Sequence, residues 1–302
     1  MYHGIINVYK EKGFTSHDVV AKLRGICKQK KIGHTGTLDP DAVGVLPVCL
    51  GSATKLCDML TDEEKEYVAV LLLGKETDTQ DSSGEVLTEK EVTASVEEVR
   101  EAIFSFLGDY AQVPPMYSAL KVNGKKLYEL AREGKEVERA ARNVVIHELE
   151  ILEEDMPRMT IRVRCSKGTY IRTLCHDIGQ KLGCGGVMES LLRSKSGQFL
   201  KEDAHTLSEI QKFADEGNLE QLVVPVEKMF TQLLPVSAKE EAKKALLNGN
   251  QLKKSEVLLP EDLVLTPGMQ VRMYNHEGRF FGVYEYQKER RLFCPVKLFF
   301  ME

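Results

Sequence analysis

The chain has 302 residues, of which 42% are hydrophobic and 29% are charged, and its formal net charge at pH 7 is −5. This length and composition exclude a disordered chain and leave room for one large domain with a small one beside it. No apolar run approaches the ~18 residues that a membrane-spanning helix needs, and the N-terminal segment has no signal-peptide pattern, so we expect no membrane association.

The N-terminal part of the chain predicts strands mixed with helices. A strand over residues 4–9 precedes a helix that Ser16 can cap, because apolar residues then recur at the helical period. A glycine-rich loop over residues 30–41 follows. Two apolar strands are predicted over residues 45–50 and 66–73, the second with burial on both faces.

Further along, a capping box that starts at Ser95 predicts another helix, and the alternation over residues 159–165 predicts a half-exposed strand. Thr169 can cap a helix that Gly183 ends. No strict βαβ rhythm, G-x-G-x-x-G pattern or Walker pattern is present. A mixed α/β sheet is therefore favoured over a doubly wound nucleotide-binding fold.

The pattern changes near residues 225–235, where a separate and small β-rich domain is predicted to begin. One helix is expected over residues 238–247. Short strands are expected over residues 270–274, 279–286 and 291–298.

The chain contains seven cysteines, and none of them forms a C-x-x-C pair. An odd number of cysteines in a long chain indicates reduced thiols in the cytoplasm rather than a disulfide framework. The histidines are scattered and show no H-E-x-x-H spacing, so we expect no metal site.

Two segments carry a local excess of positive charge despite the acidic total. Residues 158–201 contain nine Lys or Arg against two acids, and residues 121–142 contain seven against four. A basic face of this kind permits RNA binding on an acidic protein. Each run is equally consistent with an ordinary solvated surface.

The loop over residues 30–41 is the most unusual segment. Gly33 and Gly36 allow left-handed backbone geometry, and Pro40 biases Asp39 toward an extended conformation. The Asp39 carboxylate is thus presented from a stiff turn. The local pattern by itself favours a structural Asp-Pro turn, in which the side chain bonds to its own backbone.

A series of motifs, in order over the first two-thirds of the chain, resembles the TruB family of tRNA pseudouridine synthases. The matching segments are Gly4–Lys10 (GIINVYK), Gly13–Val20 (GFTSHDVV), Gly33–Pro40 (GHTGTLDP), Ala42–Pro47 (AVGVLP), Gly51–Lys55 (GSATK), Lys65–Tyr67 (KEY), Thr77–Thr79 (TDT), Asp81–Gly84 (DSSG), Val113–Lys121 (VPPMYSALK) and Ser166–Leu174 (SKGTYIRTL). The resemblance replaces the structural interpretation of Asp39 with a catalytic one.

The resemblance implies an α+β fold with a mixed, mainly antiparallel central sheet and flanking helices. The catalytic domain would span residues 1–230 and include an RNA-gripping insertion over residues 121–142, which RNA would order. A small PUA-like RNA-binding domain would span residues 231–302. This last match is the weakest and rests on the strand pattern and on Cys294–Phe299 (CPVKLF).

The activity implied by the resemblance is isomerisation of uridine 55 in the T-loop of tRNA. The flipped-out uracil leaves the sugar, rotates and rejoins through carbon, so no cofactor is needed. Asp39 would attack the sugar or assist a route through a reactive sugar intermediate, and the sequence leaves both routes open. Arg172 would pair with Asp39 through both arms of its guanidinium, and Tyr67 would stack on the uracil and take part in proton transfer at C5.

Four further residues are expected to contact the substrate by resemblance. His34 corresponds to the residue at the flipped nucleotide, and Leu191 to a wall of the uracil pocket, although the neighbouring Leu192 leaves that register open. Tyr170 and Lys121 lie inside two of the matching motifs. We expect the T-arm of tRNA as the partner, no obligate protein partner, and a monomer.

Three other functions compete with this interpretation. An RNA-binding or tRNA-folding protein would use the same surface without chemistry, and a relative acting on another RNA would share the same motifs. A small-molecule glycosidase would need a second carboxylate, for which Asp41 is the nearest candidate.

Overall fold

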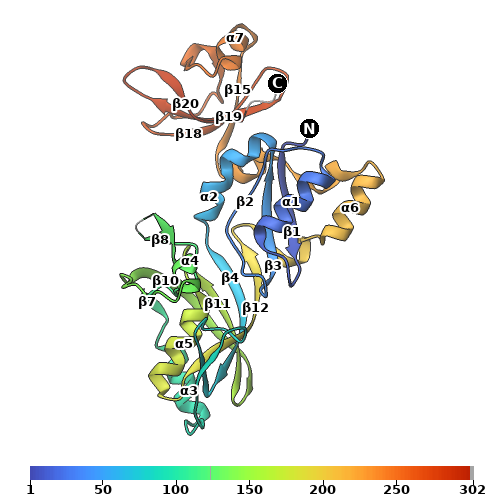
Figure 1. The fold of residues 1–302 in the computed structure, drawn as a ribbon. Helices are drawn as coiled ribbons and strands as arrows, with labels where there is room; N and C mark the ends of the chain where they lie inside the picture. Colours follow the sequence, from blue (N-terminus) through green and yellow to red (C-terminus); the bar gives the residue numbers. More distant parts are fainter. Residues whose placement is uncertain (123, 300–302) are drawn as a thin grey trace.

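The computed structural model describes residues 1–122 and 124–299 (Figure 1). Its largest element is a ten-stranded sheet. The main strands, in spatial order, are β14 (Val223–Val224), β1 (Gly4–Lys10), β3 (Val43–Leu50), β12 (Gly186–Ser196), β4 (Lys65–Leu73), β11 (Arg158–Cys165), β10 (Arg142–Asp155) and β7 (Gly108–Gln112). Two short strands, β2 (Ile32–His34) and β13 (Phe199–Leu200), pair with β3 and β12.

Only the β12–β3 pair among these strands is parallel within the described residues, so the predicted mixed and mainly antiparallel sheet is confirmed. Two pairs of helices flank it at its two ends (Figure 1). They are α1 (Ser16–Ile26) with α6 (Leu207–Asp215), and α3 (Val96–Phe104) with α5 (Ile171–Leu182). Short helices α2 (Cys57–Thr61) and α4 (Leu127–Arg132) complete this part of the molecule.

Each half of the sheet has its own apolar core, because each helix pair buries one apolar stripe on the strands beneath it. At one end, Val19 and Leu23 of α1 pack with strand residues such as Ile6. At the other end, Leu174 and Ile178 of α5 pack on β4 and β11. The Asp39 loop lies between β2 and β3, and Leu38 and Ala42 on either side of Asp39 are buried in the α5 core. The loop therefore reaches from the first half of the sheet to the second.

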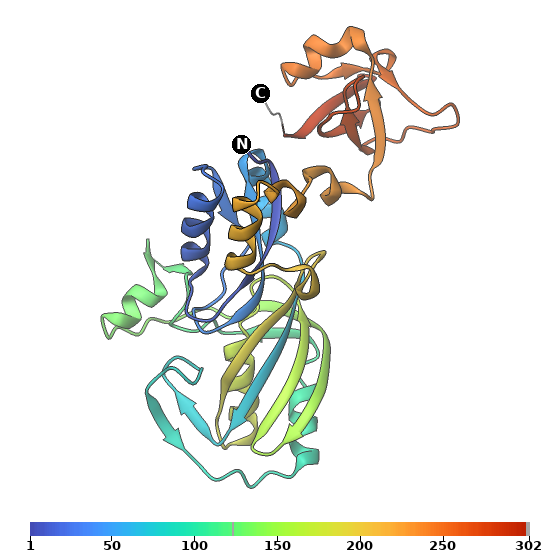
Figure 2. The ribbon, with the colours of Figure 1, turned by 90° about the vertical axis from the view of Figure 1, so that its right-hand side faces the viewer.

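Two hairpins lie outside the large sheet. One joins β5 (Lys75–Thr77) to β6 (Val86–Glu89), and the other joins β8 (Lys121–Val122) to β9 (Lys125–Lys126), directly before α4. Figure 2 shows α4 projecting away from the main sheet. Thr79, in the first hairpin, and Tyr117, shortly before the second, both hold Arg172, as described below.

The C-terminal part forms a second sheet, and the prediction of a small β-rich unit is confirmed. Its strands, in order, are β16 (Leu252–Lys253), β20 (Leu292–Leu298), β19 (Phe280–Gln287), β18 (Gln270–Tyr274), β15 (Leu234–Ala238) and β17 (Val257–Leu258), with α7 (Lys243–Leu247) beside them. Phe230, Val283 and Phe299 share an apolar cluster with residues of the first sheet. Lys55 also donates a hydrogen bond from Nζ to the Leu298 carbonyl, at 2.7 Å.

The structure corrects the predicted caps of two helices. Thr15, not Ser16, caps α1, because its hydroxyl accepts from the Asp18 backbone N–H in a reciprocal capping box. Tyr170, not Thr169, is the residue before α5, and the Thr169 hydroxyl instead donates to the Ser166 carbonyl. In both cases the cap lies one position from the predicted residue.

Three other expectations need correction. The loop over residues 30–41 contains β2, because Ile32, Gly33 and His34 pair with β3. The helix expected over residues 238–247 begins at Lys243, since the residues up to Ala238 pair in the second sheet. Strand β4 alternates between buried and half-exposed residues, so it is not buried on both faces.

Among the residues that the structure describes, no helix combines the length and the apolar character that crossing a bilayer requires.

Candidate active site

Asp39 is presented by a loop that is fastened on both sides. Before it, the Leu38 N–H donates to Ser16 Oγ at 2.9 Å, and after it the Pro40 carbonyl accepts from Gly13 N and from Lys10 Nζ, at 2.9 and 3.1 Å. The partners in these bonds lie at the end of β1, in the turn after it and at the start of α1. The backbone at Asp39 is therefore held by neighbours, and the carboxylate is left for another partner.

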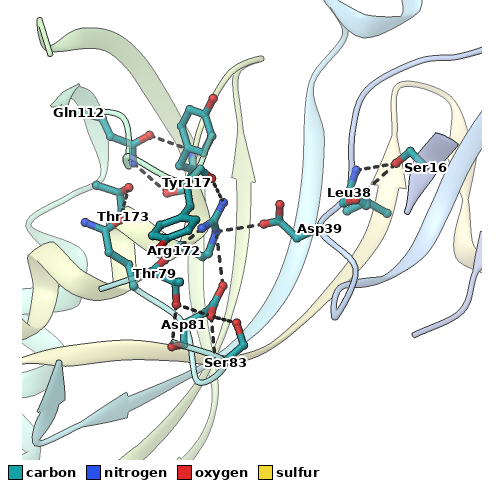
Figure 3. A network of polar contacts seen from close by, with 12 residues as sticks. Ser16, Leu38, Asp39, Thr79, Asp81, Ser83, Gln112, Tyr117, Arg172 and Thr173 are labelled. Carbon is teal, nitrogen blue, oxygen red and sulfur yellow. Dashed lines mark hydrogen bonds and ion pairs between the residues drawn. The ribbon is translucent and has the colours of Figure 1, made fainter. Parts of the chain in front are cut away.

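That partner is Arg172, the second residue of α5 (Figure 3). Its Nε lies 3.0 Å from Asp39 Oδ2, and its side chain is only 6% exposed. The ion pair expected between these two residues is thus present. The backbone does turn here, since the Ala42 N–H donates to the Asp39 carbonyl at 3.1 Å. The carboxylate itself, however, bonds to the guanidinium, and not to its own backbone as the structural interpretation expected.

The expected two-armed pairing is wrong, because Arg172 divides its donors among three segments (Figure 3). Only Nε faces Asp39, while Nη1 donates to the Thr79 carbonyl at 3.0 Å and Nη2 to the Tyr117 carbonyl at 2.9 Å. A planar guanidinium whose donors are all directed at fixed acceptors has one available rotamer. Arg172 is therefore itself rigid, and it links Asp39 to the loop before β6 and to the segment before β8.

A second carboxylate, Asp81, was not recognised as a site residue from the sequence. Its Oδ2 lies 3.8 Å from Arg172 Nε, and its Oδ1 accepts from Thr79 Oγ1 at 2.7 Å and from the Ser83 hydroxyl and N–H at 2.6 and 3.0 Å (Figure 3). The D-S-S-G turn signal is visible in the sequence. Only the folded structure shows that this turn faces Arg172.

The electrostatics of Asp39 combine opposing effects. Burial raises the pKa of its carboxyl group above the ordinary value, the Arg172 charge lowers that pKa, and the Asp81 charge raises it again. The net direction is upward. The Asp39 side chain nevertheless keeps 41% of its surface exposed, so a reactant can reach it.

Tyr67 and Leu191 lie on the same face of the sheet, close to the Asp39 loop. Leu191 of β12 pairs with Ala69 of β4, two residues from Tyr67, and it belongs to the same core as Leu38. Burial raises the pKa of the Tyr67 phenol, and the charge of Asp39 contributes in the same direction. The structure thus brings both predicted residues to the side of the sheet that Asp39 occupies, with Leu191 rather than Leu192 in that core.

Tyr170 precedes α5 and is held by Gln112 of β7 through two backbone bonds. The Tyr170 N–H donates to Gln112 Oε1 at 2.8 Å, and the Gln112 amide donates to the Tyr170 carbonyl at 2.9 Å. Burial raises the pKa of the Tyr170 phenol, and the charges of Arg172 and Asp39 both influence it. Tyr170 therefore lies near the ion pair, in a fixed position at the start of the helix.

His34 is at the end of β2, beside a second histidine. Its Nδ1 accepts from the Gly36 N–H at 3.3 Å, and its ring meets His17 edge-on at a centroid distance of 5.2 Å. Burial, His17 and Arg193 all lower the pKa of His34, so the neutral ring with its hydrogen on Nε2 is favoured. The alternative of a histidine bonded to its own turn is thus realised, and it leaves Nε2 free to donate.

Lys121 is exposed on β8, at the start of the predicted insertion. Within the part of the chain that the structure describes, it makes no contact with Asp39 or Arg172. The insertion is attached at its root, where the Leu127 N–H donates to the Leu120 carbonyl and the Tyr128 N–H to the Ser118 carbonyl. Tyr117, whose carbonyl holds Arg172, directly precedes that root.

Part of the predicted basic segment over residues 158–201 is neutralised by acids of neighbouring segments. Four of its side chains form ion pairs on the exposed face of β11 and around it. These pairs are Arg158–Glu189, Arg162–Glu150, Arg164 with Glu64 and Glu148, and Lys167–Asp62. The local excess in the sequence is therefore not one unpaired surface.

Asp41 does not supply the second carboxylate that a glycosidase would need. It forms an exposed pair with Lys12 at 3.8 Å and makes no contact with Arg172 among the described residues. No group of three or more His, Cys, Asp or Glu side chains in those residues could hold a metal ion. The arrangement can therefore supply a positioned carboxylate, an adjacent buried cation and a phenol.

Two open cavities of the described residues lie away from Asp39. One, of about 380 Å³, is lined by Leu73, Gly74, Lys90, Val92, Met156 and Pro157. The other, of about 200 Å³, is lined by Glu63, Glu64, Lys65, Arg164, Lys195 and Gly197. Neither cavity is lined by Asp39 or Arg172, so the ion pair sits on an accessible surface rather than in either of these cavities.

Comparison with known proteins assigns the family. The model of the TruB family pseudouridylate synthase N-terminal domain matches residues 24–171, and that of the tRNA pseudouridylate synthase B C-terminal domain matches residues 172–231. A tRNA pseudouridine synthase B of Lachnoclostridium phytofermentans is 53% identical, over 98% of this chain and 99% of its own length. One from Alkaliphilus oremlandii is 51% identical, over 83% of each chain.

Solved structures agree with this assignment. A chain of an H/ACA RNP bound to a substrate RNA containing 2'-deoxyuridine superposes with a TM-score of 0.71 at 25% identity, over 99% of this chain and 86% of that one. A chain of a Cbf5-Nop10-Gar1 complex also superposes with a TM-score of 0.71, at 28% identity, over 99% and 85%. The fold, the Asp39 site and the sequence match over nearly the whole length lead to one conclusion: the chain belongs to the TruB family of pseudouridylate synthases.

Proposed function

We propose that this protein is a tRNA pseudouridine synthase that isomerises uridine 55 in the T-loop of tRNA, with Asp39 as its catalytic carboxylate. The observation that carries the proposal is the Asp39–Arg172 ion pair, in which a partly exposed carboxylate meets a buried guanidinium whose three nitrogens each have a partner. The relatives of highest identity quoted above are named tRNA pseudouridine synthase B.

The reaction conserves all atoms of the uridine. The bond between N1 of uracil and C1′ of the ribose breaks, the uracil rotates, and a bond between C5 and C1′ forms. The proton on C5 is then removed and N1 gains one, so the net change is an isomerisation without oxidant or cofactor. The ionised Asp39 attacks the ribose, or assists loss of the base by the alternative route, and Arg172 keeps its carboxylate directed at the sugar.

The other predicted residues take supporting roles in this proposal. Tyr67 stacks on the uracil and, in its phenolate form, accepts the C5 proton, and Leu191 forms an apolar wall on the same face. His34 contacts the flipped nucleotide through Nε2, while Tyr170 and Lys121 contact the RNA beside the ion pair and on the insertion. The cost of unstacking the uridine is a few kcal/mol, which contacts to the RNA backbone offset.

We infer the following organisation for the complete activity. Residues 1–230 form the catalytic domain, residues 121–142 grip the T-arm, and residues 231–302 form a PUA-like domain that binds RNA. The protein acts in the cytoplasm as a monomer and needs no obligate protein partner. The single experiment that tests the activity is mapping of pseudouridine in an unmodified tRNA transcript after incubation with the purified protein; absence of pseudouridine at position 55 would contradict the proposal.

The same arrangement is compatible with action on another RNA, as in the H/ACA RNP relative. We favour tRNA because identity to the tRNA enzymes reaches 53% over nearly the full length, against 28% or less to the two H/ACA-type chains quoted above. A protein that only binds or folds tRNA would have no need for a charged carboxylate beside the RNA phosphates, so the ion pair favours the enzyme.

The pH dependence of activity should be sensitive to the charge of Asp81, the second carboxylate of the site. Activity requires ionised Asp39, and its pKa is raised, so activity is expected to fall as the pH drops through a value above that of an ordinary aspartate. Asp81→Asn removes a charge that raises this pKa, while the amide oxygen can still accept from Thr79 and Ser83. We expect the acid limb of the single-turnover rate to move to lower pH in this variant. An unchanged or upward-shifted limb would contradict the electrostatic role of Asp81.

Salt should weaken tRNA binding strongly, because basic side chains that meet phosphates release counterions. We expect affinity to fall ~10-fold or more between 50 and 200 mM salt, measured by filter binding or fluorescence anisotropy. Lys121→Ala should reduce the slope of log affinity against log salt concentration by about the amount expected for one phosphate contact. Lys212→Ala on α6 should leave that slope unchanged. A salt-independent affinity would exclude a phosphate-tracking surface.

A further inference from the structure

Arg193 of β12 is the first by volume among the fully buried side chains of the described residues, with 1% of its surface exposed. Its Nε donates to the Val45 carbonyl at 2.7 Å, and its Nη2 to the Gly36 carbonyl at 3.4 Å. No carboxylate of the described chain lies within ion-pair distance of it. Sequence analysis had counted Arg193 only as one member of a basic segment.

A buried guanidinium without an acidic partner is costly to the folded state. Two further buried ammonium groups interact with its charge and increase that cost. Lys10 donates to backbone carbonyls including Phe14 at 2.6 Å, and Lys65 donates to those of Thr61 and Glu63, both at 2.6 Å. Burial, with the charge of Arg193 acting in the same direction, lowers the pKa of each lysine to about 8. Stability alone therefore does not account for an arginine at this position.

The register of the sheet places Arg193 directly opposite Tyr67. The two residues are partners in the antiparallel pair of β12 and β4, so their side chains emerge on the same face, about 5 Å apart at Cβ. Leu191 and Ala69 form the next such pair on that face. Arg193 is thus the cross-strand neighbour of the residue that we propose as the proton acceptor.

The other side of the guanidinium rests against the Asp39 loop. A Cβ at residue 36 would lie 3.7 Å from Arg193 Nη1, and Gly36 has a φ of +121°, which disfavours any other residue there. At residue 44 a Cβ would lie 2.3 Å from the Arg193 carbonyl oxygen, so Gly44 permits β3 and β12 to approach at this point. Arg193 therefore lies between the strand of Tyr67 and both ends of the loop that presents Asp39.

We propose that Arg193 is a positioning residue for pseudouridine formation, which bridges the Asp39 loop through the Gly36 and Val45 carbonyls to the Tyr67 phenol and holds the two in a fixed relation. This inference rests on the proposed function. The Arg193 charge opposes the effect of burial on the pKa of Tyr67 and so stabilises the phenolate, the form of Tyr67 that can accept the proton from C5. The residue acts through Tyr67 and the loop and does not itself meet the reacting atoms.

The test compares Arg193→Met and Arg193→Lys with a matched control, Arg272→Met. Arg272 also donates from Nε to a backbone carbonyl, that of Leu233 at 3.0 Å, but in the second sheet. We expect Arg193→Met to lower the single-turnover rate on tRNA by ~10²-fold with a KM within about threefold of wild type, and Arg193→Lys to recover part of that loss. Arg272→Met should leave the single-turnover rate, measured with saturating enzyme so that RNA binding by the second sheet does not enter it, within about twofold.

A second measurement separates positioning from general structural damage. With 3-fluorotyrosine at position 67, the ¹⁹F signal reports the titration of that phenol in the folded protein. Arg193→Met should move the midpoint to higher pH, and Arg272→Met should not. A lowered rate with an unchanged midpoint would show that Arg193 supports only the fold, and an unchanged rate would also overturn the proposal.

Two controls keep the outcomes distinct. If Arg193→Met does not fold, as judged by circular dichroism, the test relies on the Arg193→Lys variant. Lysine keeps the charge, but one ammonium cannot bridge both carbonyls and the phenol. A wild-type rate and a wild-type Tyr67 titration midpoint in that variant would then overturn the proposal. If the wild-type protein itself forms no pseudouridine, the proposed function has failed. The fluorotyrosine titration still reads the contact between Arg193 and Tyr67 in that case.

Discussion

Asp39→Asn is expected to abolish pseudouridine formation, with a loss of at least ~10³-fold in the single-turnover rate, while tRNA affinity stays within about threefold. The amide has the shape of the carboxylate but neither its charge nor its nucleophilic oxygen. The loop should keep its conformation, because Ser16, Gly13 and Lys10 hold Leu38 and Pro40 through backbone atoms that the substitution does not touch. The measurement is pseudouridine yield in a tRNA transcript, beside a binding assay.

Asp41→Asn is the matched control for this experiment. It lies two residues further along the same loop, and its exposed pair with Lys12 contributes little to stability. We expect it to retain the wild-type rate. If Asp39→Asn converts tRNA at the wild-type rate, or if both variants lose activity equally, the assignment of Asp39 is wrong.

Arg172→Lys should lower the rate by ~10²-fold or more, although the positive charge is preserved. Arg172 meets three acceptors in different directions, namely Asp39 Oδ2, the Thr79 carbonyl and the Tyr117 carbonyl. A single ammonium cannot reach all three from one rotamer, so either the carboxylate or one of the two segments loses its partner. The rate and the thermal midpoint of unfolding should both be measured, because a buried polar group left without a partner also destabilises the fold.

Arg162→Lys is the control for that substitution, since Arg162 pairs with Glu150 on the exposed face of β11. It should leave both the rate and the thermal midpoint close to wild type. A fully active Arg172→Lys variant would mean that charge alone suffices at this position, and the role of the guanidinium geometry would have to be abandoned.

The link from Arg172 to Tyr117 bears on how RNA could influence the site. The Tyr117 carbonyl that holds Arg172 directly precedes the root of the insertion, and the Tyr117 hydroxyl donates to Asp78 Oδ2 at 3.2 Å, in the loop that carries Asp81. The insertion that we propose to meet RNA and the Tyr117 carbonyl that holds Arg172 are therefore consecutive pieces of chain. A short path of bonded groups connects them to Arg172.

Sequence by itself determined the elements whose signals are local. The capping box at Ser95, the glycine after α5 and the alternation of β11 depend only on residues a few positions apart, and each was predicted where the structure has it. The Asp39 loop also had a local signal, but that signal was ambiguous between a turn and a site. Family resemblance, rather than spacing, resolved it.

Only the tertiary structure decided which residues surround Asp39. Asp81 and Arg193 are joined to the site by the packing of α5 on the sheet and by the register of β12 against β4. That register shifts at irregularities between Met188 and Ser190 and between Arg193 and Lys195. Because one extra residue in a strand moves the following side chains to the other face, no periodicity in the sequence could show that Arg193 faces Tyr67. The sequence determined that Asp39 stands in a stiff loop, and the sheet register and helix packing determined what that carboxylate meets.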